Sequence, residues 1–69
     1  MDGRLAELGQ RVRAARTQAG QTQAEVAAAV GIHRTHVLHI EAGRENITIT
    51  TLYGLADHFG LPVSDLLAE

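Results

Sequence analysis

The fold of this chain is decided by residues 22–32, which read TQAEVAAAVGI. Thr22 and Glu25 have the spacing of a capping box, in which the threonine hydroxyl accepts from the amide of Glu25 and the glutamate side chain accepts from the amide of Thr22. Ala27 is small enough for a second helix to cross closely, and Gly31, four residues later, tolerates the positive φ of a tight turn. The stretch therefore predicts a helix that ends at Gly31 and has another helix packed across it.

Residues 33–42 continue the pattern as the second of these helices. Val37 and Ile40 lie six and nine residues beyond Gly31, where branched apolar side chains would hold the second helix against the first. Together the two segments predict a helix-turn-helix over about 23–42, with one side of its second helix left exposed for a nucleic-acid groove. The alternative that the pattern leaves open is a generic helical bundle without a ligand.

Three further helices complete the expected architecture, an all-α, five-helix domain. The first is expected over about 3–19 with Asp2 as its cap, and the fourth follows Thr48 as its cap. The fifth is short, has Pro62 in its first turn and buries Leu66. Glycines that can end a helix in the left-handed conformation stand at positions 20, 31, 43 and 60.

Length and composition narrow the classes of protein further. The 69 residues suit one domain over 1–69 with a small core, and the lack of cysteine excludes disulfides, thiolate metal sites and cysteine nucleophiles. No apolar run approaches the about 20 residues of a membrane span or forms a signal peptide, so we expect a cytoplasmic protein. Without a glycine-rich phosphate loop, paired carboxylates or a Ser–His–Asp pattern, we expect no enzyme, cofactor, metal or small-molecule ligand.

Charge is distributed unevenly along a chain whose net charge is −2 at pH 7. Residues 1–20 carry four arginines and two acidic residues, residues 21–44 carry two of each, and residues 45–69 carry four acidic residues and no lysine or arginine. All six positive charges are arginines, which can grip phosphate or guanine with two parallel hydrogen bonds. The arginine-rich part is therefore suited to face a polyanion, with the acidic end turned away from it.

Four motifs carry a resemblance to a known family. They are TQAEVA (22–27), GI (31–32), VLHIEAG (37–43) and LxxLAxxFG (52–60), and the match extends over about residues 8–67. In these motifs the chain resembles the phage Cro/repressor-type helix-turn-helix family, also called the xenobiotic-response-element family. The stretch from Arg34-Thr35 to Ile49 is similar to the small controller proteins of restriction–modification systems, a branch of that family. The resemblance implies a lambda-repressor-like fold, a two-fold homodimer on operator DNA and regulation of transcription.

The resemblance also implies roles for individual residues. Base edges are expected to be read by His33, Arg34, Thr35 and His39. DNA phosphates are expected to be contacted by Thr22, Gln23, His36, Arg44 and Asn46. Arginine can hold guanine O6 and N7 together, and threonine can meet a thymine methyl group. Arg16 and Glu41 match a partly buried structural ion pair of the family.

The histidines at 33, 36 and 39 depart from the family pattern. The family usually has serine or threonine at the place of His33, where it caps the helix, and imidazole is a poorer cap. Histidines spaced by three can also bind metal, but no carboxylate or thiol stands alongside them in the sequence, so no metal is expected. Their protonation would add positive charge on the DNA-facing side, so DNA binding should tighten as the pH falls.

Several apolar residues exceed the needs of one small core, and some are expected between two copies of the chain. The expected dimer contacts are Ile49, Tyr53, Leu61, Val63 and Leu67, with Ile47 beside them. The alternative is ordinary exposed apolar surface. A second class of function is a protein-interaction module, antitoxin-like or an adaptor, which would use the same fold and would be favoured by the net negative charge and an exposed Leu38.

Overall fold

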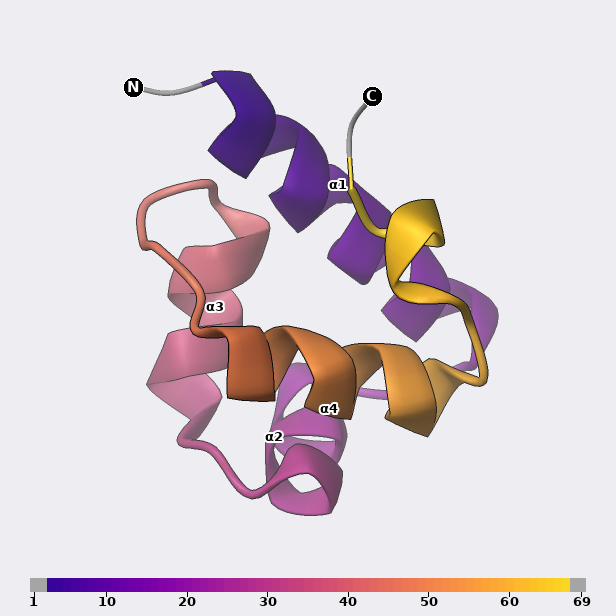
Figure 1. Ribbon diagram of the computed structural model, residues 1–69. Coiled ribbons are helices and arrows are strands. Elements are labelled where there is room, and N and C mark those ends of the chain that lie inside the picture. Colours follow the sequence, from indigo (N-terminus) through magenta and orange to yellow (C-terminus); the bar gives the residue numbers. More distant parts are fainter. Residues whose placement is uncertain (1–2, 68–69) are drawn as a thin grey trace.

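The computed structural model describes residues 3–67, which form four α-helices and one short 3₁₀ helix (Figure 1). The elements are α1 (Gly3–Gln18), α2 (Gln23–Val30), α3 (Arg34–Glu41), α4 (Ile49–Phe59) and the 3₁₀ helix η1 (Val63–Asp65). No strand occurs in this part of the chain, so the all-α class is confirmed. The expected cap at Asp2 lies outside the described residues. None of the helices within residues 3–67 has the length and apolar character needed to cross a membrane.

The expected fifth α-helix was wrong, because the chain after Pro62 makes only a single 3₁₀ turn. Asp65 N donates to Pro62 O and Leu66 N to Val63 O, each at 2.9 Å, and such three-residue spacing is typical of short helical pieces. Pro62 stands before the turn in an extended conformation rather than inside it. Leu66 is fully buried as predicted, so one tight turn suffices to seat it.

The helix-turn-helix forms from α2 and α3 as predicted. Thr22 Oγ1 accepts from Glu25 N at 3.1 Å, and Thr22 N donates to Glu25 Oε1 at 2.8 Å, which completes the capping box. Gly31 ends α2 with a φ of 83°, and both Gly31 N and Ile32 N donate to the carbonyl oxygen of Ala27. Positive φ also occurs, as expected, at the glycines at 20, 43 and 60. The buried Ala27 allows α3 to cross α2 closely.

One apolar core receives side chains from every element. Its buried members are Leu8, Val12, Val26, Ala27, Val37, Ile40, Leu52, Leu55, Ala56 and Leu66. Within it α3 packs against both α1 and α2, while α4 packs against α2 on another side. This arrangement supports α3 from two sides.

The contact between α1 and α3 brings their backbones together at Gly9. A Cβ added at Gly9 would clash with the carbonyl oxygens of Ile40 and Glu41 at the end of α3. Only glycine therefore allows the two helices to approach this closely. The contact fixes the position of α3 relative to the rest of the molecule.

Candidate nucleic-acid interface

Helix α3 lies at one edge of the molecule (Figure 1). Val37 and Ile40 are buried in the core. Because an α-helix turns by about 100° per residue, the side opposite these two carries Thr35, Leu38 and His39. Thr35 and Leu38 are exposed and His39 is half-buried. The outer side of α3 is therefore free of contacts with the core.

His33 caps α3 in place of the usual serine or threonine. Its backbone is extended, and its Nδ1 accepts from Thr35 N at 3.1 Å. An Nδ1 that accepts leaves the ring proton of a neutral imidazole on Nε2. The imidazole thus caps α3 as a hydroxyl group would, and it remains exposed at the start of the helix.

A hollow of about 520 Å³ connects the start of α2 with the start of α3. It is lined by Arg16, Gln21, Thr22, Gln23, Ala24 and Arg34. Two residues expected to contact phosphates, Thr22 and Gln23, therefore adjoin Arg34, the residue expected to read guanine. The first turn of a helix directs backbone amides and the positive end of its dipole outward, which favours an anion at this place.

Gln23 has a second role inside the molecule. Its Nε2 donates to Glu41 Oε1 at 3.1 Å, so one of its two amide hydrogens is engaged by α3. An amide group has two N–H donors, and the other remains for a ligand in the hollow. Gln23 thereby links the start of α2 to the end of α3.

Arg16 and Glu41 form a bidentate ion pair between α1 and α3. Arg16 Nε donates to Glu41 Oε2 at 2.6 Å and its second terminal nitrogen to Oε1 at 3.0 Å. The two side chains are 14% and 5% exposed. The hydrogen bond to Glu41 raises the pKa of Arg16 above its ordinary value, against the opposing effect of burial. A further bond from Arg16 to the carbonyl oxygen of Gln21 ties in the loop before α2.

A carboxylate that sequence reasoning missed lies on the other flank of α3. Glu45 Oε2 is 3.1 Å from His36 Nε2, and Glu45 Oε1 is 3.4 Å from His39 Nδ1, so both imidazoles pair with it when protonated. The loop reverses directly after α3, where Arg44 N donates to the carbonyl oxygen of His39 at 3.0 Å. Arg44 and Asn46, on either side of Glu45, are exposed. No group of three metal-ligating side chains within residues 3–67 is arranged to hold a metal ion.

The arginines divide according to whether the fold uses them. Three have partners within the fold: Arg4, Arg11 and Arg16. Across residues 3–67 the guanidinium groups of the other three, Arg13, Arg34 and Arg44, make no hydrogen bond or ion pair. Arg34 begins α3, Arg44 follows it, and Arg13 shares a hollow with Leu38 of α3. The unused positive charges thus surround α3.

The residues expected between two copies fall into two groups. Ile49 and Tyr53, one turn apart on α4, are 68% and 54% exposed, and Leu67 is exposed as well. Leu61 and Val63, with Ile47, are partly buried against the chain's own core. Most of the free apolar surface is therefore on α4, on a different element from the outer side of α3.

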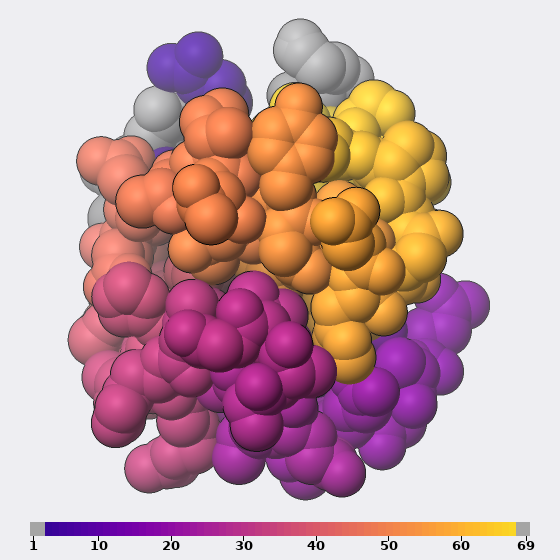
Figure 2. Space-filling model, turned by 60° about the horizontal axis from the view of Figure 1, so that its bottom comes forward, coloured from indigo at the N-terminus to yellow at the C-terminus, as the bar shows by residue number. Residues whose placement is uncertain are grey.

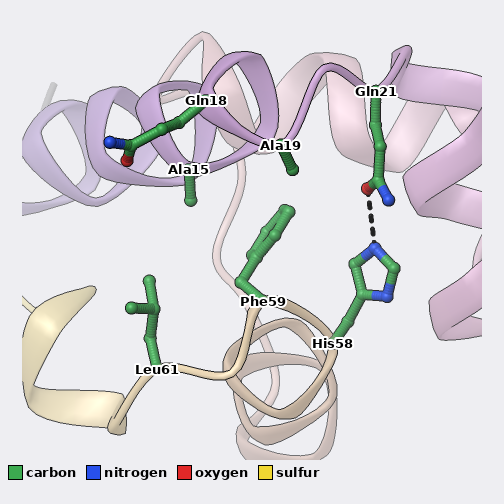
Figure 3. A pocket seen from close by; sticks show the side chains of 7 residues that line it. All are labelled: Ala15, Gln18, Ala19, Gln21, His58, Phe59 and Leu61. Carbon is green, nitrogen blue, oxygen red and sulfur yellow. Dashed lines mark hydrogen bonds between the residues drawn. The ribbon is translucent and has the colours of Figure 1, made fainter.

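A separate pocket of about 250 Å³ lies between the ends of α1 and α4 (Figure 3). The ring of Phe59 points toward Ala19, and His58 Nε2 lies 2.7 Å from Gln21 Oε1 beside it (Figure 3). No residue of α3 lines this pocket, and its volume is below the about 300–1,000 Å³ of typical ligand sites.

The space-filling view shows α4 and the turn between α2 and α3 on one continuous face (Figure 2).

Comparison with protein families matches residues 7–69 to the family described as "Helix-turn-helix domain". A comparison with curated protein sequences found no match. The match to the family covers nearly the whole chain, including α2, the turn and α3.

Solved structures of several regulators are similar to this chain. The restriction–modification controller protein C.AhdI from Aeromonas hydrophila is 31% identical with a TM-score of 0.86, over 90% of this chain and 94% of that one. The DNA-binding domain of BldD from S. venezulae is 32% identical with a TM-score of 0.85, over 97% and 100% of the two chains. The clp gene regulator ClgR from Corynebacterium glutamicum is 26% identical with a TM-score of 0.86, over 90% of this chain and 66% of that one.

Proposed function

The chain belongs to the helix-turn-helix domain family, and we propose that it is a transcriptional regulator that binds double-stranded DNA sequence-specifically. The observation that carries the proposal is the placement of the unpaired arginines. Arg34 and Arg44 are left without partners by the described part of the fold, and they lie at the two ends of α3. Guanidinium groups around an exposed helix suit a ligand that surrounds that helix with phosphates.

Helix α3 enters the major groove in this proposal. The groove is about 12 Å wide and admits one α-helix. Arg34 then reaches guanine O6 and N7, Thr35 meets a thymine methyl group, and His33 and His39 contact neighbouring base edges. The phosphates on one side meet Thr22 and Gln23. Those on the other side meet His36, Arg44 and Asn46.

Two copies bind together in this proposal, because one copy is too small to read two successive major grooves. The longest dimension of the structure is 26 Å, whereas half-sites on one face of the duplex are about 34 Å apart. The exposed Ile49 and Tyr53 of α4, with Leu67, supply apolar surface for the contact between copies. The operator is accordingly a palindrome with half-sites one helical turn apart.

Selection of bound duplexes from a random pool tests the proposal. The unaltered chain should enrich a palindrome, and the same selection with Arg34→Ala should lose a guanine preference within each half-site. Arg11→Ala is the control, because Arg11 donates to the carbonyl oxygen of Asp65 and lies apart from α3. Failure of the unaltered chain to enrich any sequence at low salt would overturn the proposal.

A protein-interaction module is the second candidate, favoured by Leu38, which is 47% exposed on the outer side of α3. Salt separates the two candidates, because DNA binding releases counterions and weakens steeply as salt rises. An apolar protein contact centred on Leu38 would not weaken in this way.

A further inference from the structure

The hollow between α1 and α3 contains an arginine that neither the fold nor the expected interface uses. We propose that Arg13 of α1 is a further phosphate contact, which extends the DNA interface beyond the helix-turn-helix. The inference rests on the proposed function. Arg13 is exposed, and within residues 3–67 its guanidinium group has no hydrogen bond or ion pair.

Arg13 adjoins the expected phosphate site through a continuous surface. Its hollow of about 280 Å³ is lined by Arg13, Arg16, Gln23, Leu38, Glu41 and Ala42. Gln23 and Arg16 also line the larger hollow that contains Thr22 and Arg34. The two hollows therefore adjoin each other along the flank of α3 that faces α1 and α2.

Arg13 carries the only positive charge in the lining of this hollow that no acidic residue of the lining balances. The charge of Arg16 is balanced by Glu41, since the two form a bidentate pair. Glu41 is the only acidic residue in the lining, and its oxygens already accept from Arg16 and Gln23. An uncompensated guanidinium with free donors in a fork can take two phosphate oxygens.

The width of the DNA groove brings this flank against the phosphates. A helix with its side chains is about 10–12 Å across, nearly the width of the major groove, so both flanks of α3 approach a sugar–phosphate strand. One flank has Arg34 and Leu38 beside Gln23 and Arg13. Leu38 meets the apolar face of a sugar or thymine methyl there while Arg13 holds the next phosphate along the strand.

The test measures the affinity of the purified chain for a non-specific duplex and for the selected palindrome over a range of salt concentrations. Arg13→Ala should lower both affinities by the same factor, roughly five- to tenfold at 0.1 M salt, and should reduce the slope of log K against log salt by about 0.9 per chain. The base preferences should not change, because phosphates carry no sequence information. Arg13→Lys should restore the slope.

Arg11→Ala is the matched control, two residues away on the same helix, and should leave the slope unaltered. If Arg13→Ala and Arg11→Ala both keep the slope of the unaltered chain, the role of Arg13 is overturned and the proposed function stands. If the unaltered chain itself shows no salt-dependent DNA binding, the proposed function fails, and the role of Arg13 fails with it. Thermal unfolding of each variant shows that the fold is intact.

Discussion

Glu41 is the residue at which α1, α2 and α3 meet. Its carboxylate accepts from Arg16 of α1 and from Gln23 of α2 while its own backbone ends α3. No buried side-chain nitrogen or oxygen among the described residues lacks a partner. Because the pKa of Arg16 is raised, its contribution to stability is fully present at neutral pH and is lost only as the pH rises past the pKa of the folded state. The pair therefore holds over the whole physiological range.

Arg16→Met should destabilise the fold severely. The substitution leaves the Glu41 carboxylate, which is 5% exposed, with only an amide partner, and such stranded charges cost about 3–5 kcal/mol. A core of this size supplies only about 3–5 kcal/mol, so the variant should be largely unfolded at room temperature. Urea denaturation followed by circular dichroism measures the loss. The double variant Arg16→Met/Glu41→Leu should recover most of it, and a single variant as stable as the unaltered chain would contradict the prediction.

Glu45→Gln should tighten DNA binding under the proposed function. Glu45 places a negative charge within 3.1–3.4 Å of two histidines that face the duplex, between the expected phosphate contacts Arg44 and Asn46. Removing one charge about 7 Å from a phosphate is worth roughly a threefold gain in affinity. Fluorescence anisotropy at low salt measures it, with Asp57→Asn on the exposed side of α4 as the control. Equal gains from both variants would show that only net charge matters.

The contacts of single residues differ in how well sequence patterns predict them. The capping box at Thr22 was predictable because both partners lie within one helical turn. The cap at His33 ran against the usual preference, since imidazole Nδ1 can accept like a hydroxyl but does so rarely. Glu45 was missed because only the reversal of the chain after α3 brings it back to the histidines. Local pairs are therefore readable from sequence, whereas contacts across a loop are not.

The packing of α1 on α3 depends on the missing side chain of Gly9. Gly9→Ala would gain about 1 kcal/mol of helix propensity. The new methyl group would, however, meet two backbone carbonyl oxygens that cannot rotate away, at a cost toward the upper end of about 1–3 kcal/mol. The variant should therefore be less stable, and thermal unfolding measures the difference. Gly3→Ala in the same helix meets no atom within 4 Å and should be neutral or stabilising; equal stability of the two variants would contradict the prediction.

Among whole elements, the helices bounded by capping residues and glycines were predictable, whereas the short segment after Pro62 was not. α2 and α4 begin at threonine caps and end at glycines, so their bounds follow from adjacent residues. The segment after Pro62 has one buried side chain, Leu66, and this is too little apolar surface to define an α-helix rather than a 3₁₀ turn. The close approach of α1 to α3 at Gly9 was not predictable, because the spacing of residues within α1 does not show which helix packs against it.

At the scale of the molecule, the proposed pairing of two copies should depend on α4. Tyr53→Glu places a charge in the exposed apolar surface with Ile49 and should reduce self-association while the fold is kept, because both side chains lie outside the core. Affinity for the full palindrome should then fall toward that for a single half-site. Sedimentation equilibrium and DNA binding measure these effects, with the exposed Gln10→Glu of α1 as the control. A variant that still associates would rule out α4 as the contact.

The family was predictable from the sequence, because its motifs are short, local in sequence and spread over nearly the whole chain. The resemblance to helix-turn-helix regulators, controller proteins of restriction–modification systems among them, is confirmed by the family match and by C.AhdI. The contact between copies stays a prediction, since Leu61 and Val63 serve the chain's own core in part and leave Ile49 and Tyr53 as surface. Apolar residues in a sequence do not reveal which partner covers them.

Only Val37 and Ile40 of α3 belong to the core, so the side chains on its outer side do not contribute to core packing. Under the proposed function, exchanging Thr35 or Leu38 should alter the preferred DNA sequence and change the free energy of unfolding by no more than about 0.5 kcal/mol. The surface of α3 can therefore acquire new DNA preferences through a few substitutions, with no compensating change in the core. An engineer who wishes to retarget the protein has the same freedom.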